Sequence, residues 1–216
     1  KIITQSEKRG RASSSFFLNY QVPIGLLRNI TFLSWYSSGL SSSDLPEWLT
    51  QLEHLRSFNL GRNQFTEIPD LIFQLKNLRL LEFYDNQISD VPAEIAQLKE
   101  LDYFRLDMNP IKEIPEVIGQ LKTLTYLNFT ECQLTEVPEF ISNLKNMKVL
   151  VFIKNKIQTV SPAIGKLKNV TRLYLNDNML TELPESITQM TSLNELNLGN
   201  NKLKSLPAKM HKMTWL

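Results

Sequence analysis

The chain has 216 residues, of which 42% are hydrophobic and 21% charged, and its formal net charge is +2. This is an ordinary globular balance, and the small net charge gives no reason to expect a nucleic-acid partner. The single cysteine cannot form a disulfide within the chain, and no apolar run approaches the roughly 20 residues of a membrane-spanning helix. We therefore expect no membrane insertion.

The N-terminal stretch shows no periodic pattern, and we predict an irregular or capping segment over residues 1–29. It starts "KIITQSEKRG", without an initiator methionine and without an apolar signal core. Either a removed targeting segment or a trimmed chain would explain such a start, and the sequence does not identify the compartment.

From residue 30 onward the sequence repeats with a period of 23 residues. The motif L-x-x-L-x-L-x-x-N-x-L occurs, for example, as "LRSFNLGRNQF" and "LDYFRLDMNPI". Its copies start at Leu55, Leu78, Leu101, Leu124, Met147, Val170 and Leu193. A degenerate copy, "ITFLSWYSSGL", starts at Ile30 and is followed by two extra residues in "SSSDLP". This register predicts an array of about eight repeats over residues 30–216.

Each unit contains the pattern of a short strand and a short helix. Alternation in the "LxL" core places both leucines on one face of a strand. A proline then precedes an apolar segment such as "IPDLIFQL", in which Ile68, Ile72 and Leu75 share a helical face. One unit cannot bury its apolar face alone, but stacked units can. We predict an α/β fold: a right-handed solenoid or horseshoe, with a parallel β-sheet on the concave face and short 3-10 or α-helical segments on the convex face.

An asparagine follows each predicted strand, and a cysteine replaces it once. These ladder positions are Asn63, Asn86, Asn109, Cys132, Asn155, Asn178 and Asn201. A buried carboxamide can bond main-chain groups of its own coil and of the next coil. Cys132 is therefore interpreted as scaffolding, because the histidines at 54 and 211 lie about three repeats away. At about 4.8 Å per strand, that separation is about 14 Å or more, too far for a Cys–His pair.

No residue pattern typical of catalysis or metal binding is present in the sequence. The seven glycines form no phosphate-binding loop, and no HExxH or clustered His and Cys pattern occurs. We therefore predict a non-catalytic protein without catalytic residues, metal or cofactor.

Segments such as "IPEVIGQLKTLTYLNF" and "IGKLKNVTRLYLNDNMLTELPESI" resemble leucine-rich repeat proteins of the 23-residue LPxxIxxLxxLxxLxLxxNxL type. The repeat sequences are similar to those of bacterial arrays, notably of pathogenic spirochaetes, and more distantly to those of eukaryotic Ras-suppressor-like scaffolds. The resemblance implies binding of a partner, usually a protein, on the concave sheet. It favours an exported or surface protein of a bacterium that interacts with a host, with a cytoplasmic signalling scaffold as the alternative. The sequence departs from the pattern at Cys132, in the widened first repeat, and at Ser161, which replaces a proline.

Candidate partner-binding residues occupy the strand positions that should point to the concave face, where five of the six tyrosines lie. We expect an exposed patch with Val151 and Ile153 at its centre, formed by Leu80, Tyr84, Tyr103, Arg105, Met108, Tyr126, Val149, Val151, Ile153 and Tyr174. Interface cores are enriched in tyrosine, and exposed apolar patches of this extent mark binding sites. Two alternatives stay open: cross-strand packing that only stiffens the sheet, and glycan binding. Because Trp35 is predicted to point inward, stacking platforms for sugars are scarce, which favours a protein partner.

Charged residues also recur with the repeat. Lysines lead into the strands at Lys76, Lys99, Lys122, Lys145 and Lys168. Acidic residues begin the convex segments, where they complement the helix dipole; a strip for an anionic partner is the alternative. The closing "MTWL" resembles the start of another unit without a cap. We therefore expect a monomer, or weak self-association through the C-terminal end.

Overall fold

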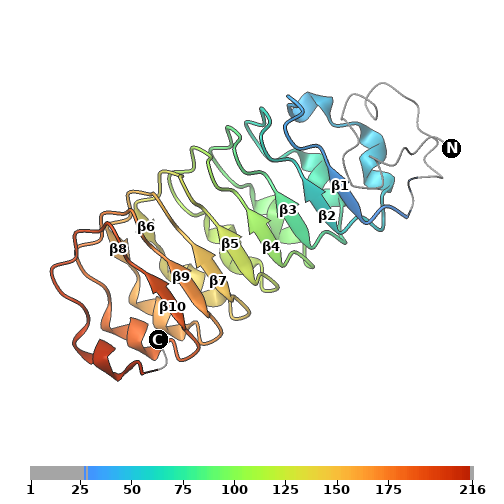
Figure 1. Cartoon of the computed structure of the whole chain (residues 1–216). Helices are drawn as coiled ribbons and strands as arrows, with labels where there is room; N and C mark the ends of the chain where they lie inside the picture. Colours follow the sequence, from blue (N-terminus) through green and yellow to red (C-terminus); the bar gives the residue numbers. More distant parts are fainter. Residues whose placement is uncertain (1–26, 28, 215–216) are drawn as a thin grey trace, which may run out of the picture.

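The computed structural model describes residues 27 and 29–214, so most of the predicted irregular segment lies outside the described residues. We number the coils 1 to 8 from the motif starts at Ile30, Leu55, Leu78, Leu101, Leu124, Met147, Val170 and Leu193. One parallel sheet contains a strand from each coil, in the order β1-β2-β3-β4-β5-β7-β9-β10. The strands are β1 (Phe32–Ser34), β2 (Ser57–Asn59), β3 (Leu80–Glu82), β4 (Tyr103–Arg105), β5 (Tyr126–Asn128), β7 (Val149–Val151), β9 (Arg172–Tyr174) and β10 (Glu195–Asn197). The array is elongated, with β1 and β10 at opposite ends (Figure 1).

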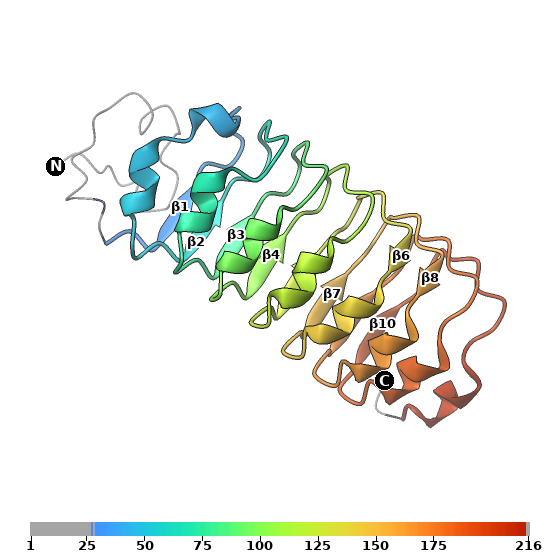
Figure 2. The same ribbon diagram turned by 180° about the vertical axis from the view of Figure 1, so that it is seen from behind.

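Short 3-10 helices cover the back of this sheet (Figure 2). They are η3 (Ser42–Asp44), η4 (Glu47–Gln51), η5 (Asp70–Gln74), η6 (Ala93–Gln97), η7 (Glu116–Gln120), η8 (Glu139–Asn143), η9 (Pro162–Lys166), η10 (Glu185–Gln189) and η11 (Ala208–Lys212). A proline stands immediately before most of them and fixes an extended approach to the first turn. The predicted arrangement of sheet and convex helical segments is confirmed.

Two columns of large apolar side chains run through the coils behind the sheet. The strand centres form the first column, from Leu33 through Phe58 and Leu81 to Leu173. The residues after the strands form the second, from Trp35, which is fully buried as predicted, to Leu175. In each column one coil packs on the next, because paired strands align residues one repeat apart. Each such side chain contributes about 1.5–3 kcal/mol by leaving water.

The departures from the repeat pattern have local structural solutions. The extra residues of coil 1 form η3, where the Asp44 carboxylate accepts hydrogen bonds from the backbone amide and the hydroxyl of Ser41, both at 2.7 Å. These bonds lower the pKa of Asp44. At the position without proline, the Ser161 hydroxyl accepts a hydrogen bond from the Ala163 amide at 3.2 Å and caps η9, which begins with Pro162. Both departures therefore leave the coil geometry intact.

A second, two-stranded parallel sheet was not predicted. It pairs β6 (Glu136–Val137) with β8 (Thr159–Val160) on the segments that lead into the convex helices of coils 5 and 6. The Ser161 amide extends the pairing by donating to the Val137 carbonyl at 2.9 Å. The sequence signal is weak, because each strand has only two residues.

One residue per coil, directly before the ladder position, adopts a left-handed backbone conformation. These residues are Ser37, Arg62, Asp85, Met108, Glu131, Lys154, Asp177 and Asn200, with φ between 53° and 58°. None is glycine, although this conformation is costly for side chains with a β-carbon. The tight turn that begins the lateral segment is therefore imposed by the stacked coils rather than by local preference.

Candidate functional site

The concave sheet face carries paired aromatic rings. Tyr103 and Tyr126 align across β4 and β5, and their rings stack with centroids 4.1 Å apart and an angle of 5° between their planes. Burial raises the pKa of the Tyr103 hydroxyl, and the neighbouring Tyr126 adds to the shift. The Tyr103 phenol is therefore neutral near physiological pH, and the two stacked rings present a rigid, half-buried surface.

Arg105 is held by carboxylates from its own and the preceding coil. Its Nε and Nη2 atoms donate to the two Asp107 carboxylate oxygens at 2.9 and 2.8 Å, and its Nη1 atom lies 3.4 Å from Glu82. The guanidinium also lies 4.1 Å from the ring centroid of Tyr84. Burial raises the pKa of Glu82, although Arg105 opposes the shift. Arg105 is thus fully engaged within the sheet face and orients its neighbours.

Tyr84 reaches across coil 2 to a second tyrosine. Its ring centroid lies 5.9 Å from that of Tyr36, two coils away. Gly61 lies between them, and a β-carbon there would come within 2.6 Å of the Tyr84 Cζ atom. Arg62 lies 5.7 Å from the Tyr36 ring centroid and forms an ion pair of 3.2 Å with Asp85. Sequence reasoning missed this contact because it depends on the absence of a side chain at Gly61.

The expected apolar centre of the patch is mostly inaccessible. Val149 and Val151 are only 7% and 6% exposed, so the expectation that they form an exposed surface is wrong. They lie on β7 between β5 and β9, where the register sets the larger Tyr126 beside Val149 and the larger Tyr174 beside Val151. Ile153 and Tyr174 are half-buried.

The other predicted patch residues lie at varied depths. Leu80 is half-buried on β3, and Met108 is 41% exposed on the turn after β4. Tyr36 is equally exposed, and Phe32 on β1 is 50% exposed. Phe32 and Tyr36 are not in the predicted patch, although both occupy its strand positions in coil 1. The accessible aromatic surface is therefore displaced toward the N-terminal coils.

The ladder asparagines bind main-chain atoms of two coils, as predicted. In one example, Nδ2 of Asn109 donates to the carbonyls of Phe83 and Leu106 at 2.9 and 3.0 Å, and its Oδ1 accepts from the Ile88 amide at 2.9 Å. Equivalent bonds form at Asn63, Asn86, Asn155, Asn178 and Asn201. Cys132 is buried in the same row, so its position agrees with the scaffolding interpretation.

The convex lysines bond to helix carbonyls and a side chain of the convex surface. Lys122 Nζ donates to the Gly119 carbonyl at 2.6 Å, and Lys168 Nζ donates to the Gln189 carbonyl of the next coil at 2.6 Å. Lys76 Nζ donates to the Gln97 side chain at 2.6 Å. These bonds favour the interpretation that the lysines stabilise the convex segments over the alternative that they form a basic strip for an anionic partner.

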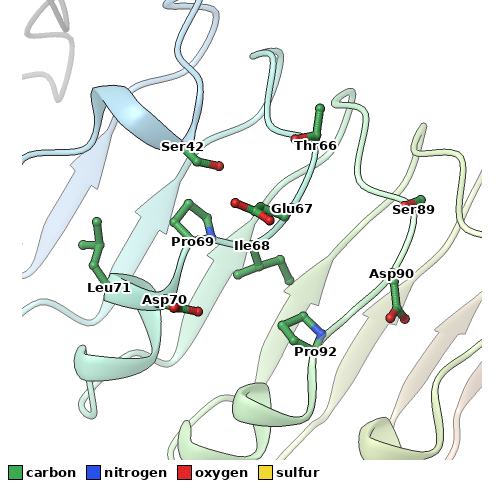
Figure 3. A pocket seen from close by; sticks show the side chains of 10 residues that line it. All are labelled: Ser42, Thr66, Glu67, Ile68, Pro69, Asp70, Leu71, Ser89, Asp90 and Pro92. Atoms are coloured by element: carbon green, nitrogen blue, oxygen red, sulfur yellow. The ribbon is translucent and has the colours of Figure 1, made fainter.

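A shallow pocket lies on the lateral side of coils 1 to 3 (Figure 3). Its lining includes three carboxylates, from Glu67, Asp70 and Asp90, and no His, Cys, Lys or Arg. Across residues 27 and 29–214, no group of three His, Cys, Asp or Glu side chains is arranged to hold a metal ion. The same residues contain no helix of the length and apolarity needed to span a bilayer.

The family model of the leucine-rich repeat region matches residues 36–128 and 116–216 of the chain. The chain belongs to the leucine-rich repeat family. A solved leucine-rich repeat protein from Leptospira interrogans is 35% identical, covers 88% of this chain and superimposes with a TM-score of 0.82. The chain spans about half of that protein, 48% of its length. This similarity confirms the predicted likeness to bacterial leucine-rich repeat proteins.

Two further solved leucine-rich repeat structures show the same fold. Internalin C2 from Listeria monocytogenes is 20% identical, with a TM-score of 0.77 over 90% of this chain and 82% of the internalin. A plant peptide hormone receptor, solved in complex with the peptide RGF2, is 25% identical, with a TM-score of 0.66 over 82% of this chain and 33% of the receptor. No curated protein matches the sequence significantly. The leucine-rich repeat family and fold typically serve as non-catalytic interaction modules.

Proposed function

We propose that this leucine-rich repeat protein binds another protein through its concave sheet face. One observation carries the proposal: tyrosines at outward strand positions keep accessible area while the repeat's leucines and phenylalanines already fill the core. Stacking of Tyr103 on Tyr126 holds two of these rings in place before any partner arrives. Rigid aromatic rings lose little conformational entropy on binding, and they dominate the energy of many interfaces.

The size of the face and the relatives support a macromolecular partner. Eight strands spaced about 4.8 Å apart give a face roughly 35 Å across, which accommodates an interface of standard size. The plant receptor of similar fold was solved with a peptide hormone. The Leptospira relative supports a bacterial setting. We further propose that the protein is exported and meets a host partner.

Site-specific photo-crosslinking tests which face of the solenoid contacts the partner. A benzophenone amino acid would replace Ile153 or Tyr174 on the concave face, and Glu94 or Gln120 on the convex face as matched controls. All four positions lie in the solenoid, and the two convex positions are exposed. After incubation with host-cell extracts and irradiation, we expect discrete crosslinked protein bands from the concave positions only.

The opposite pattern would overturn the proposal. Crosslinks to a defined partner from Glu94 or Gln120, with none from the concave positions, would place the interface on the convex face. Crosslinking that disappears after protease treatment of the extract would confirm a protein partner, whereas loss after glycosidase treatment alone would favour a glycan.

A further inference from the structure

We propose that the partner's main anchor is an uncharged aromatic or large apolar side chain that contacts the N-terminal part of the concave face. The contact surface, which we call the Tyr36–Tyr84 platform, consists of Phe32, Tyr36, Leu80 and Tyr84; Gly61 is buried against the Tyr84 ring. The inference rests on the proposed function and adds a location and a partner chemistry. It moves the centre of binding by several coils from the patch expected around Val151.

Among the described residues, coil 1 carries two exposed large hydrophobic side chains, and every other coil carries at most one. Phe32 and Tyr36 are 50% and 41% exposed, whereas the valines at the expected centre are nearly buried. Farther along the sheet, β9 and β10 present the exposed polar residues Arg172, Glu195 and Asn197. Large exposed apolar side chains that lie together mark binding surfaces more reliably than single ones.

Coil 2 lies between the coils that carry the platform side chains and has small residues at two concave positions, Ser57 and Gly61. In the strand register, Ser57 lies between Phe32 and Leu80. At the other end of the strand, Gly61 leaves the space that the Tyr84 ring occupies beside Tyr36. Gly61 is therefore a positioning residue: any side chain there would displace the ring.

Charge complementarity favours an uncharged anchor. The charged groups that border the platform are paired with one another: Arg62 with Asp85 at 3.2 Å, and Arg105 with Asp107 and Glu82 at 2.8 and 3.4 Å. The guanidiniums of Arg62 and Arg105 also lie over the two tyrosine rings. A charged anchor would have to compete with these pairs, whereas an apolar one would gain from burial against the rings.

The test uses a random 12-residue peptide library on phage, selected against the whole protein. Selected peptides would be synthesised, and their affinities measured for the wild type, Tyr36→Ala and Gly61→Ala. Tyr174→Ala reports on the other end of the concave face, and Leu206→Ala, which shortens an exposed side chain outside the strands, is the matched control. Tyr36→Ala removes a largely exposed ring, and circular dichroism and thermal melting would verify that each variant is folded.

We expect the selected peptides to be rich in Phe, Trp, Leu or Met and low in net charge. Their affinity should fall about tenfold or more with Tyr36→Ala and Gly61→Ala, and less than twofold with Leu206→Ala. It should change less than twofold between 50 and 500 mM NaCl, on the order expected without ionic contacts.

Three outcomes would overturn the inference, and they separate it from the proposed function. Peptides rich in charged residues with salt-sensitive binding would contradict the uncharged anchor. Peptides that lose affinity with Tyr174→Ala but not with Tyr36→Ala would remove the platform while leaving concave-face binding in place. Peptides insensitive to all the concave variants, or no micromolar binders at all, would count against the concave face itself.

Discussion

The Sγ atom of Cys132 lies 3.5 Å from the carbonyl oxygen of Leu106, where a carboxamide stands in the neighbouring coils. An asparagine at this position would also accept a hydrogen bond from the amide 21 residues earlier, as Asn155 Oδ1 accepts one from the Leu134 amide at 3.1 Å. The corresponding Ile111 amide instead donates to the Asn109 carbonyl at 2.8 Å, around Pro110. The fixed φ of proline suits such a tight turn, so coil 4 compensates for the missing acceptor.

Replacing Cys132 with asparagine should therefore be neutral or stabilising by up to about 1 kcal/mol, the net value of a typical hydrogen bond. Urea unfolding measures the change. The matched control is Asn155→Cys in the next coil, which should cost about 1–3 kcal/mol because it leaves the Leu134 amide without an acceptor. A decrease of more than about 1 kcal/mol in the free energy of unfolding of Cys132→Asn would contradict the interpretation of Cys132 as a ladder residue.

The native thiol should react slowly with a bulky maleimide. Cys132 is 7% exposed, and burial raises its pKa to about 12, well above its ordinary value of 9.0. The folded state holds this thiol protonated at pH values where the unfolded state releases the proton. The stability that the buried neutral thiol contributes is therefore fully present below pH 9 and is lost as the pH rises from 9 toward 12. Labelling at pH 7.5 with and without 6 M urea is the measurement, and equal rates would contradict burial.

The two stacked tyrosines should be energetically coupled. A double-mutant cycle of Tyr103→Ala and Tyr126→Ala should give a coupling energy of about 0.5–1.5 kcal/mol in unfolding, as for other aromatic pairs. In partner binding, the double variant should lose about 2 kcal/mol or more if the rings are anchors. If unfolding shows the coupling but partner affinity stays unchanged, the rings only stiffen the sheet.

Arg105→Ala should destabilise the protein by about 2 kcal/mol, because it leaves Asp107 buried without its charged partner. Arg62→Ala is the matched control: its ion pair with Asp85 is exposed, so its loss should cost less than about 1 kcal/mol. Adding Asp107→Asn should recover part of the loss at Arg105. Equal effects of the two arginine substitutions in denaturant unfolding would show that burial of the pair is unimportant.

Met108→Asn should stabilise the fold by about 0.5–1 kcal/mol, since asparagine tolerates the left-handed conformation better than methionine. Met179→Asn is the control, because Met179 is similarly exposed but does not have positive φ. A comparison of the thermal unfolding of the two variants separates the effect of the backbone conformation from the effect of a more polar side chain. A similar shift in both would point to surface polarity alone.

Much of the architecture was predictable because a 23-residue period fixes strand, turn and helix together. The burial of Trp35 and the role of Cys132 followed from register alone. The site was less predictable, because register gives the direction of a side chain but not its depth. Val149 occupies an outward strand position as predicted, yet larger side chains on the adjacent strands leave it buried. The Tyr36–Tyr84 contact depends on Gly61, whose missing side chain leaves no positive signal in the sequence.

The ladder bonds link atoms 21 to 26 residues apart, and the strands pair residues one repeat apart. Insertion or duplication of a whole coil therefore preserves every such contact, while a change of one residue within a coil shifts all of them. Coil 1 shows where a shorter change is tolerated: its two additional residues fold into η3, outside the ladder and the sheet. Such arrays can lengthen in evolution by whole repeats, and each added coil brings a further set of side chains to the concave face.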